Sequence, residues 1–176
     1  NALQKNRDKQ ILKYESTVKE TEKNIQTLME NIDEKTKDVV EKESTIKNKD
    51  TVEDRLKQTL NLEKQLEVAR KKAIKDIEFY ENHDNCPTCK QGLDHEHKKK
   101  CIQEKTEKVS EIKKAVTELD TKIKELHDEI NFINRVQEEI LEKQREIGLL
   151  QTEITSNQKY IGKVHDQIND LRKAQI

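Results

Sequence analysis

Apolar residues recur along most of the chain at spacings that alternate between three and four. The first series consists of Ile11, Tyr14, Val18, Thr21, Ile25, Leu28, Ile32, Lys35, Val39, Lys42 and Ile46. This alternation is the a/d pattern of a heptad repeat, and it predicts a helix that pairs with another helix in a coiled coil. A second series of the same kind runs from Ile102 to Leu171. The sequence therefore predicts two long helical arms.

The pattern is interrupted at a few points. In the first arm it slips near Val52 and again at residues 60–62, and it resumes at Leu66. In the second arm a three-residue step from Ile133 to Val136 shifts the phase, as a stammer does in a coiled coil. We expect the arms to bend at the phase shifts near Val52 and Val136, where fewer contacts are buried.

Lysine and glycine mark the weaker parts of the arms. Lys35, Lys42 and Lys49 fall on consecutive d positions. Their long stems can reach past the apolar seam, but we expect this stretch to be the least stable and most easily bent part of the first arm. Gly148 and Gly162 weaken the second arm modestly, because glycine is a poor helix former.

The two arms are related by a mirror point in the sequence. Seam residues such as Ile11 with Val164 and Leu28 with Ile147 have numbers that add up to 175, although 178 fits better near the turn. The mirror point lies between Pro87 and Thr88, so the register is predicted to within one helical turn. The predicted fold class is all-α: a long antiparallel intramolecular coiled-coil hairpin, ~120 Å long. Its predicted parts are an outgoing arm at 1–82, an apex at 83–93 and a returning arm at 94–176.

Composition excludes several classes of protein. Charged residues make up 40% of the chain and apolar residues 31%, which is too little apolar surface for an ordinary globular core, while the heptad spacing argues against a disordered chain. The net charge of −1 gives no general case for nucleic-acid binding, and no segment approaches the ~20 apolar residues of a membrane span. Because the sequence starts at Asn1 without a methionine, we expect an internal piece of a longer protein.

The predicted apex contains the only proline of the chain and two of its three cysteines, in the motif Cys86-Pro87-Thr88-Cys89. Pro87 cannot continue a helix, and Gly92 is expected to supply the backbone freedom for the turn. The Cys-x-x-Cys spacing lets one turn present two thiolates to a tetrahedral metal, but a structural zinc site needs four ligands. The missing two could come from a second copy of the apex or from the same chain. A third interpretation is a redox dithiol without metal.

The alternatives differ in what they require. A redox dithiol needs a thioredoxin-like βαβ surround, which the sequence does not predict. A site within one chain would need His95, His97 or Cys101, yet the two histidines are two residues apart and should project on different sides of a helix. For them and for His83 the simpler interpretation is a solvated histidine near a helix end, and for Cys101 a thiol at the edge of the seam. A zinc ion shared by Cys86 and Cys89 of two chains is therefore favoured.

A long antiparallel coiled coil with Cys-Pro-x-Cys at its mirror point resembles the zinc-hook region of the SbcC-type, SMC-like ATPases of DNA double-strand-break repair. The Lys-, Ile- and Asn-rich composition is similar to that of members from T-even-like phages. The resemblance implies that Cys86 and Cys89 are zinc ligands and that the apex forms a homodimer. It further implies a parent protein that binds ATP and Mg²⁺ and works with a partner nuclease on DNA at a distant ATPase head.

The sequence predicts a structural tethering module in which two apices share one Zn²⁺. The fragment itself is predicted not to be an enzyme, because it contains no phosphate-binding Gly-x-x-x-x-Gly-Lys-Ser/Thr loop. The alternative is a protein-binding coiled coil whose self-contained zinc tip docks an unrelated partner.

Two other features near the apex have simpler explanations. The basic run at residues 98–100 is better explained as a solvated helix face, and the aromatic pair Phe79 and Tyr80 as packing at the end of the arm. We expect no membrane partner. The three cysteines form no disulfide framework, so we expect a reducing intracellular location, in cytoplasm or nucleus, or host cytoplasm for a phage protein.

Overall fold

The computed structural model describes residues 1–85 and 91–174. Within them the chain forms three α-helices: α1 (Ala2–Thr45), α2 (Lys49–Asn82) and α3 (His95–Lys173). The only β-type pairing in this part of the chain is an isolated antiparallel bridge between Asn85 and Gly92. The predicted all-α class is confirmed.

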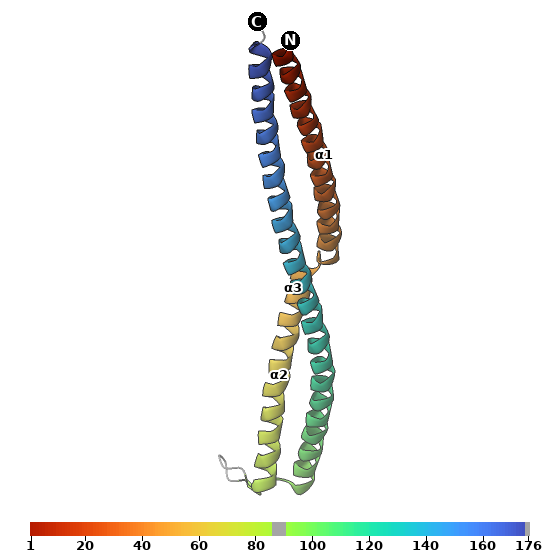
Figure 1. The fold of residues 1–176 in the computed structure, drawn as a ribbon. Helices are drawn as coiled ribbons and strands as arrows, with labels where there is room; N and C mark the ends of the chain where they lie inside the picture. The colour runs from red at the N-terminus through yellow and green to blue at the C-terminus, as the bar shows by residue number, and fades with distance from the viewer. Residues whose placement is uncertain (86–90, 175–176) are drawn as a thin grey trace. The chain divides into compact units, whose positions relative to one another are not determined.

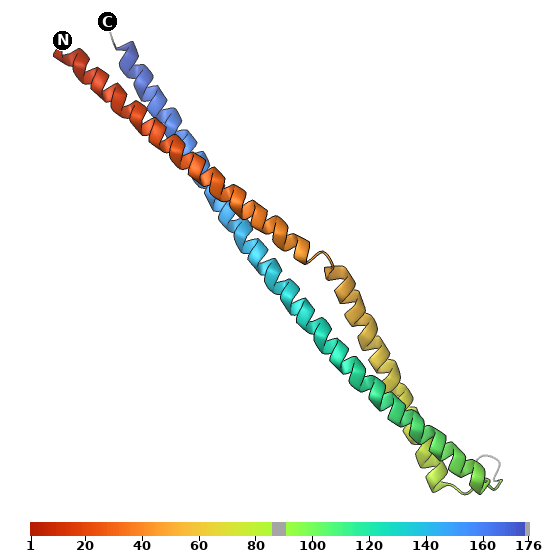
Figure 2. The ribbon, with the colours of Figure 1, turned by 90° about the vertical axis from the view of Figure 1, so that its right-hand side faces the viewer.

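The helices form two compact units. The first consists of residues 1–47 and 135–176, where α1 lies antiparallel to the C-terminal part of α3 (Figures 1 and 2). The second consists of residues 48–134, where α2 lies antiparallel to the N-terminal part of α3. Helix α3 thus contributes to both units. Each unit is an antiparallel pair of helices, as the mirror relation between the two arms predicts.

Burial in the first unit follows the predicted seam. One apolar cluster contains Val18, Val164 and Ile168 with Ile11, Tyr14 and Ile161, and a second contains Val39, Val136 and Ile140 with Ile46 and Ile147. The predicted partners Ile11 and Val164 fall in the same cluster, and each cluster also includes the seam residue one turn further along α3. The ion pairs show the register more directly, because the residue numbers of Lys35 with Glu146 and of Lys42 with Glu139 both add up to 181. The predicted sum of 175 is therefore wrong by six residues, or ~1.7 helical turns.

The first arm is divided between α1 and α2 at residues 46–48. The hydroxyl groups of Ser44 and Thr45 donate hydrogen bonds to the carbonyl oxygens of Glu41 and Lys42, at 2.6 and 2.7 Å. Side chains that bond to a carbonyl three residues back compete with the helical bonding pattern. The Asn48 side chain forms no capping hydrogen bond to α2. The end of α1 is thus favoured by its own side chains.

Both arms contain an extra three-residue step close to the boundary between the units, as in a stammer. Partly or fully buried positions follow one another at steps of three at Ile46, Lys49 and Val52, and again at Ile130, Ile133 and Val136. The two phase shifts predicted near Val52 and Val136 are confirmed. In the first arm the helix is interrupted as well, whereas α3 continues without a break.

The slip predicted at residues 60–62 is wrong. Leu60 and Leu62 are 41% and 45% exposed, and the partly buried positions of this stretch are Thr59 and Glu63. These positions continue the spacing of three and four that starts at Val52. In an unbroken helix the spacing of the residues determines which side chains face the partner helix. The two leucines would reach the seam only if α2 were distorted. The helix keeps its geometry, and two polar residues occupy the seam instead.

The seam lysines of the first unit are paired with carboxylates of α3. Lys35 Nζ lies 2.7 Å from Glu146 Oε2, and this hydrogen bond lowers the pKa of Glu146. Lys42 Nζ lies 3.1 Å from Glu139 Oε2, which raises the pKa of Lys42. In the second unit Lys49 pairs within α2, with Glu53 at 3.9 Å. The stems cross the seam while the charges stay at its edge, as expected for lysine; the low stability of this stretch stays a prediction.

Two carboxyl groups meet at the seam of the second unit. The carboxyl group of Glu63 in α2 lies close to that of Asp120 in α3, and this contact raises the pKa of Glu63; burial and the negative charges of Asp120 and Glu67 act in the same direction. Among the described residues, the covered Oε2 of Glu63 has no hydrogen-bond partner. Glu67 is itself hydrogen-bonded by Arg70, which lowers the pKa of Glu67.

We predict that this pair makes the second unit more stable as the pH falls. A carboxyl group whose pKa is raised by folding binds its proton more tightly in the folded state. The contribution of Glu63 to stability therefore increases as the pH is lowered from 7 toward the ordinary glutamate value of 4.5. The substitution Glu63→Gln should raise the stability at pH 7, and its gain over the wild type should shrink as the pH is lowered. Urea unfolding of both proteins at several pH values measures this, and an unchanged pH slope in Glu63→Gln would contradict it.

Gly148 and Gly162 lie at exposed positions inside α3, and a β-carbon at either would meet nothing within 4 Å. We predict that Gly148→Ala and Gly162→Ala each stabilise the protein, by up to ~1 kcal/mol, because alanine loses less backbone entropy in a helix. Chemical unfolding followed by circular dichroism measures the change. Gly92→Ala, outside the helices, is the matched control and should show no such gain. Destabilisation by either α3 substitution would show that its glycine has a role in packing.

Candidate functional site

The predicted zinc ligands Cys86 and Cys89, with Pro87, lie outside the described residues, but the two ends of their segment are described. Helix α2 ends at Asn82, and the Leu93 N–H donates to the carbonyl oxygen of Asp84 at 2.8 Å. Next to this bond, Asn85 and Gly92 form the antiparallel bridge. The backbone thus pairs the residues that flank 86–90 in the sequence. Both pairs are centred between positions 88 and 89, one residue later than the predicted mirror point.

Gly92 does not play the part predicted for it. Its backbone is not in the left-handed region that favours glycine, and a β-carbon there would lie 3.7 Å from Asn85 Oδ1, an ordinary contact distance. The turn at this end of the loop therefore does not depend on glycine.

An ion pair ties the end of α2 to the first turns of α3. Lys98 Nζ lies 3.0 Å from Asp84 Oδ1, and this hydrogen bond lowers the pKa of Asp84. The Lys98 side chain is only 14% exposed, so its stem is packed while its charge reaches the loop. At the start of α3, the Glu96 N–H donates to Asp94 Oδ1 at 3.3 Å, which satisfies one of the free amides of the first turn. Both ends of the loop are fixed by side chains of the described residues.

His83 is held as a residue at the end of a helix. Its Nδ1 lies 2.9 Å from the carbonyl oxygen of Phe79, and its ring stacks on the Phe79 ring at a centroid distance of 4.7 Å. Phe79 also contacts Tyr80 edge to face at 5.4 Å. These rings pack at the end of α2, as the sequence predicts for the aromatic pair.

His95 and His97 have different surroundings, although both are exposed. His95 lines a shallow groove of about 280 Å³ with Lys98, Lys99 and Ile102. His97 Nε2 instead lies 3.5 Å from Cys101 Sγ. The prediction that the two imidazoles project on different sides of the helix is confirmed.

Cys101 is partly buried, in agreement with its predicted place at the edge of the seam. Its two polar contacts were not predicted. Besides His97, the Tyr80 side chain of α2 lies close to the Cys101 side chain, and this contact raises the pKa of Tyr80. The contact with His97 could have been found from the spacing alone, because residues four apart lie on one face of a helix. The contact with Tyr80 depends on the pairing of α2 with α3.

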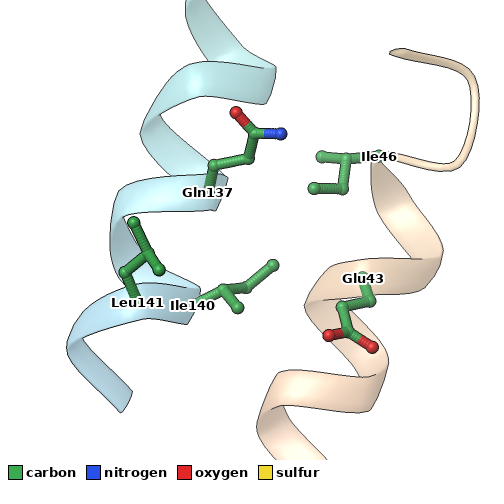
Figure 3. A pocket seen from close by; sticks show the side chains of 5 residues that line it. All are labelled: Glu43, Ile46, Gln137, Ile140 and Leu141. Atoms are coloured by element: carbon green, nitrogen blue, oxygen red, sulfur yellow. The ribbon is translucent and has the colours of Figure 1, made fainter. Parts of the chain in front are cut away.

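The grooves elsewhere are shallow and mainly apolar. In the first unit, a groove of about 410 Å³ lies between the end of α1 and α3 (Figure 3). It is lined by Glu43, Ile46, Gln137, Ile140 and Leu141. With one carboxylate and one amide, it does not present the paired acid and base that hydrolytic chemistry uses. No group of three or more His, Cys, Asp or Glu side chains that could hold a metal ion is found within residues 1–85 and 91–174.

None of the helices in the described part of the chain is long and apolar enough to cross a membrane. Compared with known proteins, the chain matches no family model, no curated protein and no solved structure.

Proposed function

We propose that this chain is a structural tethering module, and that its apex joins a second copy by sharing one zinc ion between Cys86 and Cys89 of each chain. The observation that carries the proposal is the position of the Cys-Pro-x-Cys motif at the turn between two antiparallel helices. The backbone pairs at Asp84–Leu93 and Asn85–Gly92 support it, because they bring the two ends of the motif's segment together. Two thiolates within four residues suit one half of a tetrahedral zinc site.

The chemistry of the site accounts for a contact of small area. Two loops that meet head-on bury little apolar surface, so metal ligation has to supply most of the free energy of association. Structural zinc sites in small peptides contribute on the order of 10–16 kcal/mol. The symmetrical contact uses the same patch on both copies, as in a two-fold dimer. The chain's own role is to hold the thiols at the end of a helical pair, where a second copy can reach them.

By its resemblance to the zinc-hook ATPases, the module belongs to an intracellular protein that tethers and processes DNA ends together with a nuclease. In that proposal ATP, Mg²⁺ and DNA are bound by other parts of the parent protein. The residues of this chain contribute the tether and no catalytic group.

The test is a comparison of the wild-type chain with Cys86→Ser and with Cys86→Ser/Cys89→Ser. Loss of a thiolate from each chain leaves at most two in a shared site, so the dimer should dissociate while the helix content stays close to that of the wild type. Chelators and acid should act in the same way, because protons compete for thiolates. Analytical ultracentrifugation, combined with metal analysis, measures both the mass and the bound zinc.

The double variant His95→Ala/His97→Ala is the control and should still dimerise. The zinc content of Cys86→Ser/Cys89→Ser should be lower than that of the wild type by half an ion per chain. A loss of one ion per chain, with dimerisation unaffected, would favour the alternative of a self-contained tip. A Cys86→Ser protein that still forms a zinc-bound dimer would refute the proposal.

A further inference from the structure

A thiol and an imidazole lie side by side in the first two turns of α3. Cys101 Sγ is 3.5 Å from His97 Nε2, and the residues are four apart in the sequence. Both are outside the motif of Cys86 and Cys89, and both are described by the structure. Because side chains four apart share one face of a helix, the backbone of α3 itself holds the pair together.

The separation of the two atoms suits a metal. Zinc binds thiolate at ~2.3 Å and imidazole at ~2.0–2.1 Å in tetrahedral geometry, so sulfur and nitrogen on one ion lie ~3.6 Å apart. The observed distance of 3.5 Å is close to this value. One ion could therefore bind both atoms with little movement of the helix. Mixed thiolate and imidazole ligands favour Zn²⁺ over hard cations such as Mg²⁺ or Ca²⁺.

The surroundings of the pair leave room for an ion and support the thiolate. His97 is exposed and Cys101 is partly buried, so one side of the pair faces solvent. The Tyr80 side chain of α2 lies close to the Cys101 side chain, and an outer neighbour of this kind can orient a metal ligand. The nearby ammonium groups of Lys98 and Lys105 are paired with Asp84 and Asp76, at 3.0 and 3.3 Å. Their positive charge is thus partly neutralised.

We propose that His97 and Cys101 form a second zinc site, separate from the cysteines of the apex motif. The chain supplies two ligands, the Cys101 thiolate and His97 Nε2, and water occupies the remaining positions. Binding releases the thiol proton of Cys101, so the affinity falls as the pH is lowered. The site does not depend on the proposed zinc-bridged dimer.

The experiment uses the Cys86→Ser/Cys89→Ser chain, in which Cys101 is the only thiol, and Co²⁺ as a spectroscopic probe for zinc. Titration should give a sulfur-to-cobalt charge-transfer absorption that saturates at one ion per chain and disappears when Zn²⁺ is added. In the same background, Cys101→Ser should abolish the absorption. His97→Ala should weaken cobalt binding at least ~10-fold, because one of two protein ligands is lost. His95→Ala is the matched control and should bind cobalt as the parent variant does.

Circular dichroism verifies that each variant keeps its helices, so loss of binding is not loss of folding. An absence of the charge-transfer absorption, or an affinity unchanged by His97→Ala, would overturn the second site. Dimerisation of the chain that carries only Cys101→Ser reports on the apex separately. Failure of one proposal therefore leaves the result for the other unaffected.

Discussion

The burial of one narrow apolar seam between two antiparallel helices is the constraint on which the rest of this structure depends. A chain with 31% apolar residues cannot enclose a globular core, but two helices can bury a stripe made of two apolar residues per heptad against each other. The clusters around Val18 and Val39 are short segments of this stripe. Because a pair of helices has no further interior, polar groups are found mainly at the edge of the seam, on the outer faces and at the helix ends, while Thr59 and Glu63 occupy seam positions.

A periodic seam does not define its own register, since a slide by one heptad restores the same pattern of apolar positions. Charged residues partly share this periodicity. If α1 moved by seven residues along α3, Lys35 would face Glu153 instead of Glu146, and Lys42 would face Glu146 instead of Glu139. Features that do not repeat are therefore needed to select one register. Two such features would be lost in the seven-residue slide. Lys143 Nζ, which lies 3.9 Å from Asp38 Oδ2, would be level with Thr45 instead. The three-residue steps in the two arms would no longer lie opposite each other.

The same geometry determines where chemistry can occur. Residues of one helix face meet at every turn, which is how His97 and Cys101 come together. Residues of different helices meet only along the seam, which brings Tyr80 to Cys101 and Glu63 to Asp120. In the second unit the loop that contains the two cysteines connects the end of α2 to the start of α3. Its ends are fixed by Asp84 bonding to both Leu93 and Lys98, so the segment with the two cysteines is anchored at its base.

The sequence by itself determined the helices, their antiparallel pairing and the phase shifts near Val52 and Val136, because heptad periodicity is a local property of the chain. It misjudged Leu60 and Leu62, since hydrophobicity suggested a slip that the continuous geometry of α2 does not make. Only the tertiary structure decided which polar residues enter the seam and which partners they find there. Such contacts as Glu63 with Asp120 depend on the side-by-side alignment of two distant segments, and no spacing within either segment contains that information.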